Sequence, residues 1–361
     1  MFLLKNYCII VSSVQRINMK SFIQLFLTLF LLLFSMKSIA QDPHFSQFYA
    51  NPMYLNPAYT GINYCPTWVL NYRNQWPALP GDYVTYSTTV DFGVQEIHGG
   101  LGLIALHDNA GSGVLKTTNI SLLYSYHNYL SSSTLLTAGF QFSYLQRTLD
   151  TNHFFGDQID ELYGFIYPTF DPLANNDYLN AGYADLSAGL ALTMDKYWVG
   201  LALHHLTEPN YSFLEANNTG KLPMKITLHG GSSVGIKDLG WFNNTFMSRF
   251  KVFKPHLIIQ KQAVSSQINI GGNLESDKMA LGLAYRRGFN NSDAIIILMG
   301  YELTQSASAA FFQRIRIGYS YDLTVSKLGI SSGGSHEISI RMQLPCIYKV
   351  PGQKAIPCPQ F

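Results

Sequence analysis

The feature that most constrains this chain is an alternation of apolar side chains with small or polar ones, repeated in segments of about ten residues. In "LTAGFQFSYLQ", one set comprises Leu136, Ala138, Phe140, Phe142 and Tyr144, and the other comprises Thr137, Gly139, Gln141 and Ser143. The stretches "RIRIGYSYD" (314–322) and "HEISIRMQL" (336–344) alternate in the same way. Because successive side chains of a β-strand point to opposite faces, each segment predicts a strand with one apolar face.

Together these segments predict an all-β fold, a transmembrane antiparallel β-barrel whose apolar face meets lipid. A soluble β-sandwich also alternates, but its polar face meets bulk water and rarely collects so many Gly, Ala and Ser residues. Charged residues make up 13% of the chain, whereas about 25% is usual in soluble domains. After residue 40, no segment reaches the roughly 20 apolar residues of a transmembrane helix.

About fourteen strands can be counted in the predicted barrel, residues 65–344, and an even number lets both chain ends lie on the periplasmic side. The strands are expected near residues 65–72, 82–92, 99–108, 118–128, 133–148, 183–194, 196–205, 225–237, 251–262, 266–274, 278–286, 293–303, 311–321 and 336–344. Long connections at 149–182 and 206–224 follow odd-numbered strands, as outer loops should. Two connections fit less well, because 238–250 is long for a turn and 263–265 is short for an outer loop. The count could therefore differ by one hairpin.

Residues 1–40 have the composition of a secretory signal peptide. They contain no acidic residue, Lys20 precedes the apolar run "FIQLFLTLFLLLF", and the region ends in the small-residue site Ser38-Ile39-Ala40. We expect Met19 to be the start and Gln41 the mature N-terminus; a single transmembrane anchor is the alternative. Removing residues 1–40 leaves 20 basic and 22 acidic residues. This balance gives no indication of nucleic-acid binding.

The N-terminal segment, residues 41–64, is rich in aromatic residues but has no helical or strand periodicity. It contains two Asn-Pro pairs in "QDPHFSQFYANPMYLNPAYTG". Proline disfavours helix in the residue before it, and asparagine favours turns. We expect two consecutive turns that pack against the barrel interior or its periplasmic mouth and plug the bore; a disordered lead-in is the alternative. The residues expected to make these contacts are Phe45, Phe48, Tyr49, Asn51, Pro52, Tyr54, Asn56, Pro57, Tyr59 and Gly61.

Charged side chains on the inner face of the predicted strands indicate a charged lumen. They are Arg286, Arg314, Arg316, Asp322, Glu337 and Arg341. Such residues either pair with one another and fill the bore, or line a selective path for a solute.

Three cysteines follow the predicted leader, and no C-x-x-C pair indicates a zinc or redox site. Cys346 and Cys358 could close a small loop in the C-terminal tail and leave Cys65 free. Three unpaired thiols are an equal alternative.

No catalytic, metal or cofactor site is expected. "GSSVG" (231–235) matches the nucleophile elbow of a hydrolase, but it lies in an alternating strand with no helix after it. The connection 149–182 is both acidic and aromatic. It could dock a partner, bind a cation, or form a lid that packs on itself.

The stretch "DPHFSQFYANPMYLNPAYTG" closely resembles the N-terminal signature of the PorP/SprF family of type IX secretion system membrane proteins. Similar stretches follow along the chain, namely "YRNQWPAL" (72–79), "GLIALHDNAG" (102–111), "FGDQID" (155–160), "VGLALHHLTEPN" (199–210), "GLAYR" (282–286), "IGYSYD" (317–322) and "GSHEISI" (334–340). The resemblance implies a non-enzymatic outer-membrane barrel without a cofactor. Its implied partners are outer-membrane lipid, a secreted adhesin or other type IX cargo, and periplasmic components of the secretion system.

The end of the chain suggests which branch of the family is closer. The tail, residues 345–361, is expected to be periplasmic, and its Cys-Pro-x-Phe end resembles the branch that serves particular adhesins in gliding motility. Two alternatives remain open, a core component of the translocon and a passive solute porin.

Overall fold

The computed structural model describes residues 42–150, 156–160, 162–165, 168–170, 178–213, 220–239, 249–288, 292–304, 311–326 and 329–346. The chain divides into two compact units, residues 1–40 and 41–361, and every described residue belongs to the second. The predicted signal peptide with its start at Met19, and the tail beyond residue 346, lie outside the described residues.

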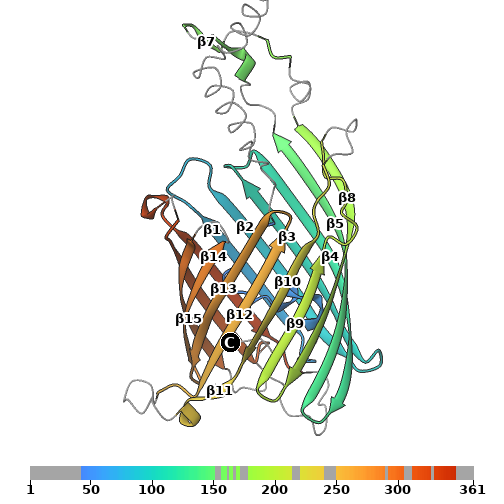
Figure 1. Ribbon diagram of the computed structural model, residues 1–361. Helices are drawn as coiled ribbons and strands as arrows, with labels where there is room; N and C mark the ends of the chain where they lie inside the picture. Colours follow the sequence, from blue (N-terminus) through green and yellow to red (C-terminus); the bar gives the residue numbers. More distant parts are fainter. Residues whose placement is uncertain are drawn as a thin grey trace, which may run out of the picture. The chain divides into compact units, whose positions relative to one another are not determined.

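The second unit is a closed antiparallel barrel of fourteen strands (Figure 1). The strands are β1 (Thr67–Gln75), β2 (Tyr83–Val94), β3 (Gly99–Ala110), β4 (Leu115–Ser131), β5 (Thr134–Asp150), β8 (Tyr178–Met194), β9 (Tyr197–His204), β10 (Lys225–Ser232), β12 (Val252–Gln262), β13 (Ser265–Glu275), β14 (Met279–Gly288), β15 (Ser292–Thr304), β16 (Arg314–Thr324) and β17 (Ser335–Gln343). Pairing of β1 with β17 closes the ring, and β11 (Val234–Gly235) extends the edge beside β12. The predicted fold class and strand count are confirmed.

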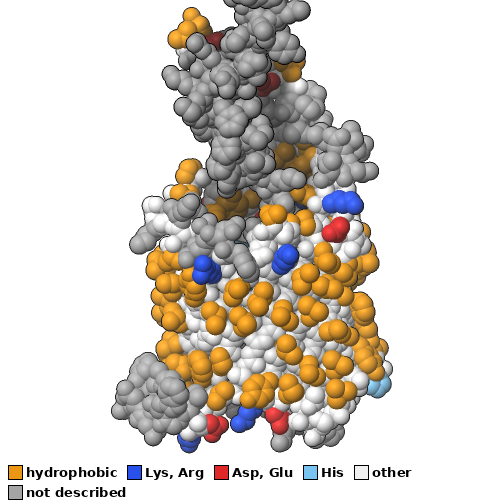
Figure 2. Space-filling view, in the orientation of Figure 1, with side chains coloured by type: hydrophobic (Ala, Val, Ile, Leu, Met, Phe, Trp, Pro, Cys, Tyr) orange, Lys and Arg blue, Asp and Glu red, His pale blue; other side chains and the backbone are white. Residues whose placement is uncertain are grey.

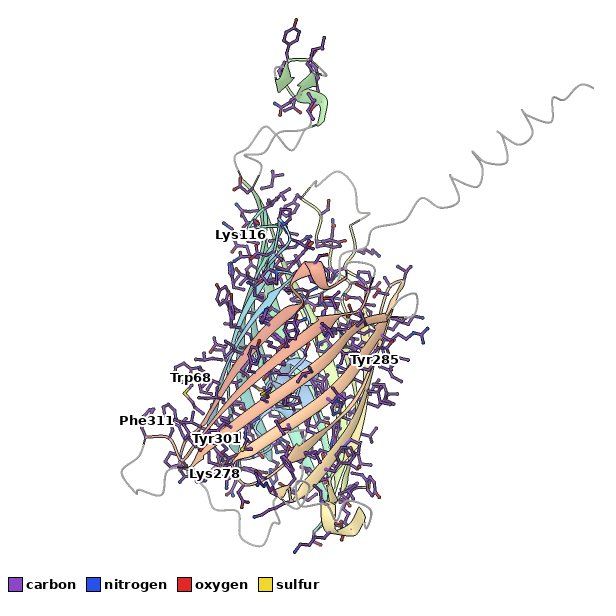
Figure 3. The ribbon with its side chains drawn as sticks, turned by 90° about the vertical axis from the view of Figure 1, so that its left-hand side faces the viewer. Trp68, Lys116, Lys278, Tyr285, Tyr301 and Phe311 are labelled. Atoms are coloured by element: carbon purple, nitrogen blue, oxygen red, sulfur yellow. A yellow bond between two sulfur atoms is a disulfide. The ribbon has the colours of Figure 1, made fainter. Side chains whose placement is uncertain are left out.

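The outer wall of the barrel carries the apolar half of the alternation. Phe140, Phe142 and Tyr144 on β5 are all more than half exposed, whereas Thr137 and Ser143 on the same strand are buried. Figure 2 shows a broad apolar band on the visible face, with charged side chains above and below it. In Figure 3, Lys116 lies toward one end of the wall and Lys278 toward the other. This pattern is typical of a barrel wall in contact with lipid.

The two ends of the barrel differ in their connections. β1 begins and β17 ends at the same end, which also carries the short turns 95–98, 132–133, 195–196 and 276–278. Both termini of bacterial outer-membrane barrels lie on the periplasmic side, so this end is periplasmic. The opposite, outer end carries the long connections 151–177 and 205–224. One of these contains η2 (Gly156–Gln158) and the small hairpin of β6 (Ile159–Asp160) and β7 (Gly164–Phe165).

The two connections that fitted less well do not change the strand count. Residues 263–264 form a tight turn, with Ala263 at a φ of 50°, between the directly paired β12 and β13. The connection after β11 includes η4 (Ile236–Leu239), and its residues 240–248 lie outside the described part. β10 pairs directly with β12 across this connection, so the ring stays complete.

Helical structure is sparse in the described part of the chain. Besides η2 and η4 it comprises α3 (Pro52–Leu55), η1 (Pro57–Tyr59) and η6 (Ile330–Ser332). No helix of the described residues is long and apolar enough to cross a membrane.

Candidate functional site in the barrel lumen

Residues 42–64, called the lumen segment below, run inside the barrel before β1 begins (Figure 1). Each Asn-Pro pair starts a short helical turn, because proline is well suited to the first helical position. Pro52 begins α3, and Pro57 begins η1. Asn56 lies between the two turns and caps the second one, since its Oδ1 accepts a 2.9 Å hydrogen bond from the N–H of Ala58.

Most of the predicted contact residues in the lumen segment are buried. Phe48, Tyr49, Asn51, Pro52, Asn56, Pro57, Tyr59 and Gly61 are buried, and Phe45 and Tyr54 are half-buried. Asn56 shows how the wall satisfies the polar groups of the segment. Its amide nitrogen lies 3.1 Å from the carbonyl oxygen of Leu190 on β8 and 3.3 Å from that of Leu201 on β9. A buried amide group destabilises the fold when its hydrogen bonds are missing. These two contacts therefore stabilise Asn56 at its buried position.

Glycines on the inner wall make room for the two turns. A Cβ at Gly139 would lie 2.3 Å from the backbone nitrogen of Ala58, and one at Gly189 would lie 1.9 Å from Oδ1 of Asn56. Real Cβ atoms do not come this close to other heavy atoms. These two inward positions therefore fit η1 only as glycine. The alternation assigns both residues to the inner face, but nothing in it indicates that a segment packs there.

A buried ionic cluster binds the first half of the lumen segment. This Arg73 cluster consists of Arg73, Arg286, Asp322 and Glu337 on the wall, together with Ser46. Arg73 lies 2.9 Å from Asp322 and 3.1 Å from Glu337, and all three side chains are at most 2% exposed. Arg286 lies 3.0 Å from Asp322 and also pairs with Asp293.

The cluster is bonded to the backbone of the segment as well as to its side chains. The carboxylate of Glu337 accepts the backbone N–H groups of Ser46 and Gln47, at 2.7 and 3.0 Å. The hydroxyl of Ser46 donates to Asp322 at 2.6 Å and accepts from both arginines at 2.9 Å. Each of these hydrogen bonds has a charged partner on the wall, and charge-assisted hydrogen bonds are stronger than neutral ones.

The other charges that were expected in the lumen are more scattered. Arg316 is partly exposed and pairs with Glu302, and Arg341 is half-buried on β17. The side chain of Arg314 is 61% exposed and lies 3.9 Å from Glu302. Arg314 has the same parity along β16 as Arg316, but it is the first residue of the strand and its side chain is exposed at the barrel end. Arg73 was missed, although it alternates with Asn71 and Gln75 in "NYRNQ".

A second charged cluster holds the beginning of the lumen segment against β8 and the outer ends of β9 and β10. This His205 cluster consists of Asp42, Asp185, His205 and Lys225. The two ring nitrogens of His205 lie 2.8 Å from Asp42 and 2.9 Å from Asp185. Burial by itself would lower the pKa of His205, but these carboxylates outweigh it and raise the pKa to about 9. Burial would likewise raise the pKa of Asp42, but His205 and Lys225 hold that pKa well below its usual range.

The base of the lumen segment is fixed at the periplasmic end. The N–H of Gly61, which has a φ of 62°, donates to Asp91 on β2 at 2.8 Å, and the hydroxyl of Ser125 donates to the carbonyl of Thr60 at 2.6 Å. Cys65 then forms a disulfide with Cys346. The expected Cys346–Cys358 pair is therefore wrong, because Cys346 is already bonded. Antiparallel pairing of β1 and β17 brings Cys65 and Cys346 together at the barrel seam, although they are 281 residues apart. Cys358 lies outside the described residues.

A small cavity lies beside the lumen segment, next to β10, β12 and β13. The cavity has a volume of about 30 Å³ and is lined by Asn51, Tyr54, Lys225, Gln260 and Asn269, among others. It has room for a few water molecules at most.

The described residues contain no group of three or more His, Cys, Asp and Glu side chains that could hold a metal ion. Ser233 of "GSSVG" lies in the wall between β10 and β11, and its N–H donates to the carbonyl of Lys196. A single turn of 3₁₀ helix follows it, instead of the α-helix that a nucleophile elbow requires.

A family model described as "Type IX secretion system membrane protein PorP/SprF" matches residues 37–342. A search of curated proteins found no match. Several solved barrels are similar at low identity. A FadL homologue of Pseudomonas aeruginosa is 12% identical with a TM-score of 0.44, covering 81% of this chain and 93% of the homologue. The toluene transporter TodX of Pseudomonas putida is 9% identical with a TM-score of 0.41, covering 81% and 92%. The translocator domain of the autotransporter NalP from Neisseria meningitidis is 10% identical with a TM-score of 0.32, covering 77% and 85%.

Proposed function

The chain belongs to the PorP/SprF family of type IX secretion system membrane proteins, and on this basis we propose that it supports the secretion or surface anchoring of a partner adhesin used in gliding motility. The family is non-enzymatic, and the fold is that of an outer-membrane barrel. The adhesin is the proposed cargo. Contacts with periplasmic components of the secretion system, made through the tail 345–361, are part of the same proposal.

One observation carries the proposal, namely that the lumen segment runs inside the barrel and is bonded to the wall at its start, its middle and its base. The His205 cluster holds the start of the segment, and the disulfide holds its base. The Arg73 cluster holds the rest of its first half, and its second turn packs on Gly139 and Gly189. In this proposal the barrel is a scaffold that carries a plug in its bore. Its working surfaces are then the outer connections and the periplasmic end.

The same observation weighs against a passive solute porin. A porin needs a continuous water-filled path, and the lumen segment runs through the bore and is held to the wall near its start and at its base. The remaining alternative function is that of a core component of the translocon. Such a component would use the same surfaces but would serve every cargo.

Deletion of the gene, followed by quantitative mass spectrometry of culture medium and cell surface, tests the proposal. Loss of one large adhesin, with other type IX cargo unchanged, is the expected result. Loss of all type IX cargo would replace it with the core-translocon function. No change in any secreted protein would reject both, and the porin function would then be tested by conductance.

A further inference from the structure

The connection between β5 and β8 contains a small ordered element, which we call the outer hairpin: the described residues among 156–170. Two carboxylates organise it from within. Oδ1 of Asp160 accepts the N–H groups of Leu162 and Tyr163, at 2.8 and 3.0 Å. Oδ2 of Asp157 accepts the N–H of Phe170 at 2.8 Å and the hydroxyl of Thr169 at 2.9 Å. The N–H of Phe170 is also the main cause of the lowered pKa of Asp157.

The outer hairpin exposes apolar side chains to solvent instead of burying them. Ile159 is 52% exposed, Leu162 85%, Tyr163 76% and Phe170 91%. Single exposed apolar residues are common on protein surfaces, but four large ones on one short hairpin are not. Exposed aromatic clusters of this kind are the usual anchors of protein–protein contacts. The expected alternative of a lid that packs on itself does not fit these four side chains.

The charge of the connection limits what the hairpin can bind. Residues 151–177 contain five Asp and Glu residues and no Lys or Arg. Like charges oppose docking to a second copy of the same connection, and they oppose insertion into an anionic lipid surface. A protein surface with Lys and Arg around an apolar pocket complements both the charge and the apolar side chains.

We infer that the outer hairpin docks a secreted protein through an apolar pocket that is rimmed by Lys and Arg. This inference rests on the proposed function, since it makes the docked protein the cargo that the barrel serves. Leu162, Tyr163 and Phe170 enter the pocket, and the negative charge of the connection complements the basic rim. Asp157 and Asp160 keep the apolar side chains in place by bonding the backbone.

Crosslinking in intact cells tests this contact directly. A photoreactive phenylalanine analogue placed at Tyr163 or Phe170 of the full chain should form an adduct with one secreted protein. The matched control carries the analogue at Leu206, a 42%-exposed apolar residue in a different outer connection, and should not form that adduct. Adducts with lipopolysaccharide or with a second copy of this chain, or no adduct at all, would overturn the inference.

Substitution tests the chemistry of the contact. The triple variant Leu162→Ser, Tyr163→Ser, Phe170→Ser should reduce surface retention of the crosslinked protein by about tenfold or more, because aromatic anchors dominate such interfaces. Leu206→Ser should leave retention unchanged. Ile159→Lys with Leu162→Lys should lose more retention than Ile159→Glu with Leu162→Glu, because only the lysines repel a basic rim. Equal loss in the two charged pairs would refute the basic rim.

The deletion strain distinguishes failure of the docking site from failure of the proposed function. If deletion of the gene removes the adhesin from the surface but the triple serine variant retains it, the docking site is wrong and the proposed function stands. If deletion leaves the surface proteins unchanged, the proposed function itself fails. Surface protease accessibility of each variant confirms that the barrel has been assembled.

Discussion

At the scale of single residues, Arg73 links the buried carboxylates of the wall to Ser46 of the lumen segment. Its guanidinium bonds Ser46, Asp322 and Glu337 while remaining almost completely buried. Without it, two carboxylates would stay buried with only Arg286 to compensate them. The exposed Arg314 offers a natural comparison, since exposed ion pairs contribute little to stability.

Arg73→Leu should therefore release the first half of the lumen segment, with a loss of about 3–5 kcal/mol from the buried pairs. Limited proteolysis of the folded barrel, with the cleavage sites read by mass spectrometry, measures this release. Arg314→Leu is the matched control and should behave like the unchanged protein. Equal resistance of both variants would show that the cluster does not hold the segment.

Substitution of Gly139 tests how closely η1 packs on β5. Gly139→Ala places a Cβ 2.3 Å from the backbone nitrogen of Ala58, so η1 must move away from β5. Hydrogen exchange at residues 56–61 should rise, while the barrel strands stay protected. Gly300→Ala is the control, because a Cβ there meets only ordinary contacts, the nearest at 3.4 Å. If exchange at residues 56–61 stays low in Gly139→Ala, the close packing of η1 on β5 is wrong.

The His205 cluster predicts a pH dependence at the start of the lumen segment. The pKa of His205 is raised from 6.5 to about 9 by Asp42 and Asp185 despite burial, so its stabilisation is complete below pH 6.5 and is lost as the pH rises through about 9. The pKa of Asp42 is lowered from 3.8 by His205 and Lys225, so its contribution is complete above pH 3.8 and is lost only in stronger acid. Protection of the amides near residue 42, relative to their intrinsic exchange rate at each pH, should fall when the pH passes 9. His205→Gln should remove that alkaline step, and persistence of the step would assign it to another group.

At the scale of elements, the seam between β1 and β17 joins the two ends of the barrel and the base of the lumen segment. Nine residue pairs from Thr67–Gln343 to Gln75–Ser335 close the wall. The disulfide at Cys65 and Cys346 adds a covalent link just below them. Ring closure rests on backbone hydrogen bonds, and the disulfide ties the tail to the base of the segment.

Removal of this disulfide should loosen the seam without opening the barrel. Cys65→Ser with Cys346→Ser should lower the temperature at which the barrel unfolds in a gel-shift assay, since native disulfides typically contribute about 2–4 kcal/mol. Peptide mapping without reductant should recover the Cys65–Cys346 link in the unchanged protein and in a Cys358→Ser control. A link from Cys346 to Cys358 would contradict the structure.

At the scale of the whole molecule, the barrel and its lumen segment form one structure with two separable roles. The wall supplies a lipid-facing apolar band, and the segment supplies the packing that the bore would otherwise lack. The strands close the ring among themselves, through direct pairing of every neighbour. The wall should therefore survive loss of the segment.

Planar-bilayer recording tests this division. The full chain should show no steady ion conductance, and a variant lacking residues 43–60 should conduct, because the wall then encloses an open bore. A mutant of the lipid-facing wall, Phe140→Leu, serves as the control and should stay silent. Steady conductance by the full chain would return the porin function to consideration.

The sequence by itself indicated the barrel, a count of about fourteen strands and the apolar faces of several of them, because the period of two is a local property that membrane and lumen impose on each strand. It also indicated two turns at Asn51-Pro52 and Asn56-Pro57, since proline and asparagine act on their own backbone. Only the tertiary structure decided which residues meet. The Arg73 cluster joins the lumen segment to β1, β14, β16 and β17, and the disulfide joins residues 281 positions apart. Gly139 on β5 and Gly189 on β8 likewise pack against turns that are more than eighty residues away in the sequence. Such contacts follow from closure of the ring, which brings distant strands together around the bore, and no local pattern records them.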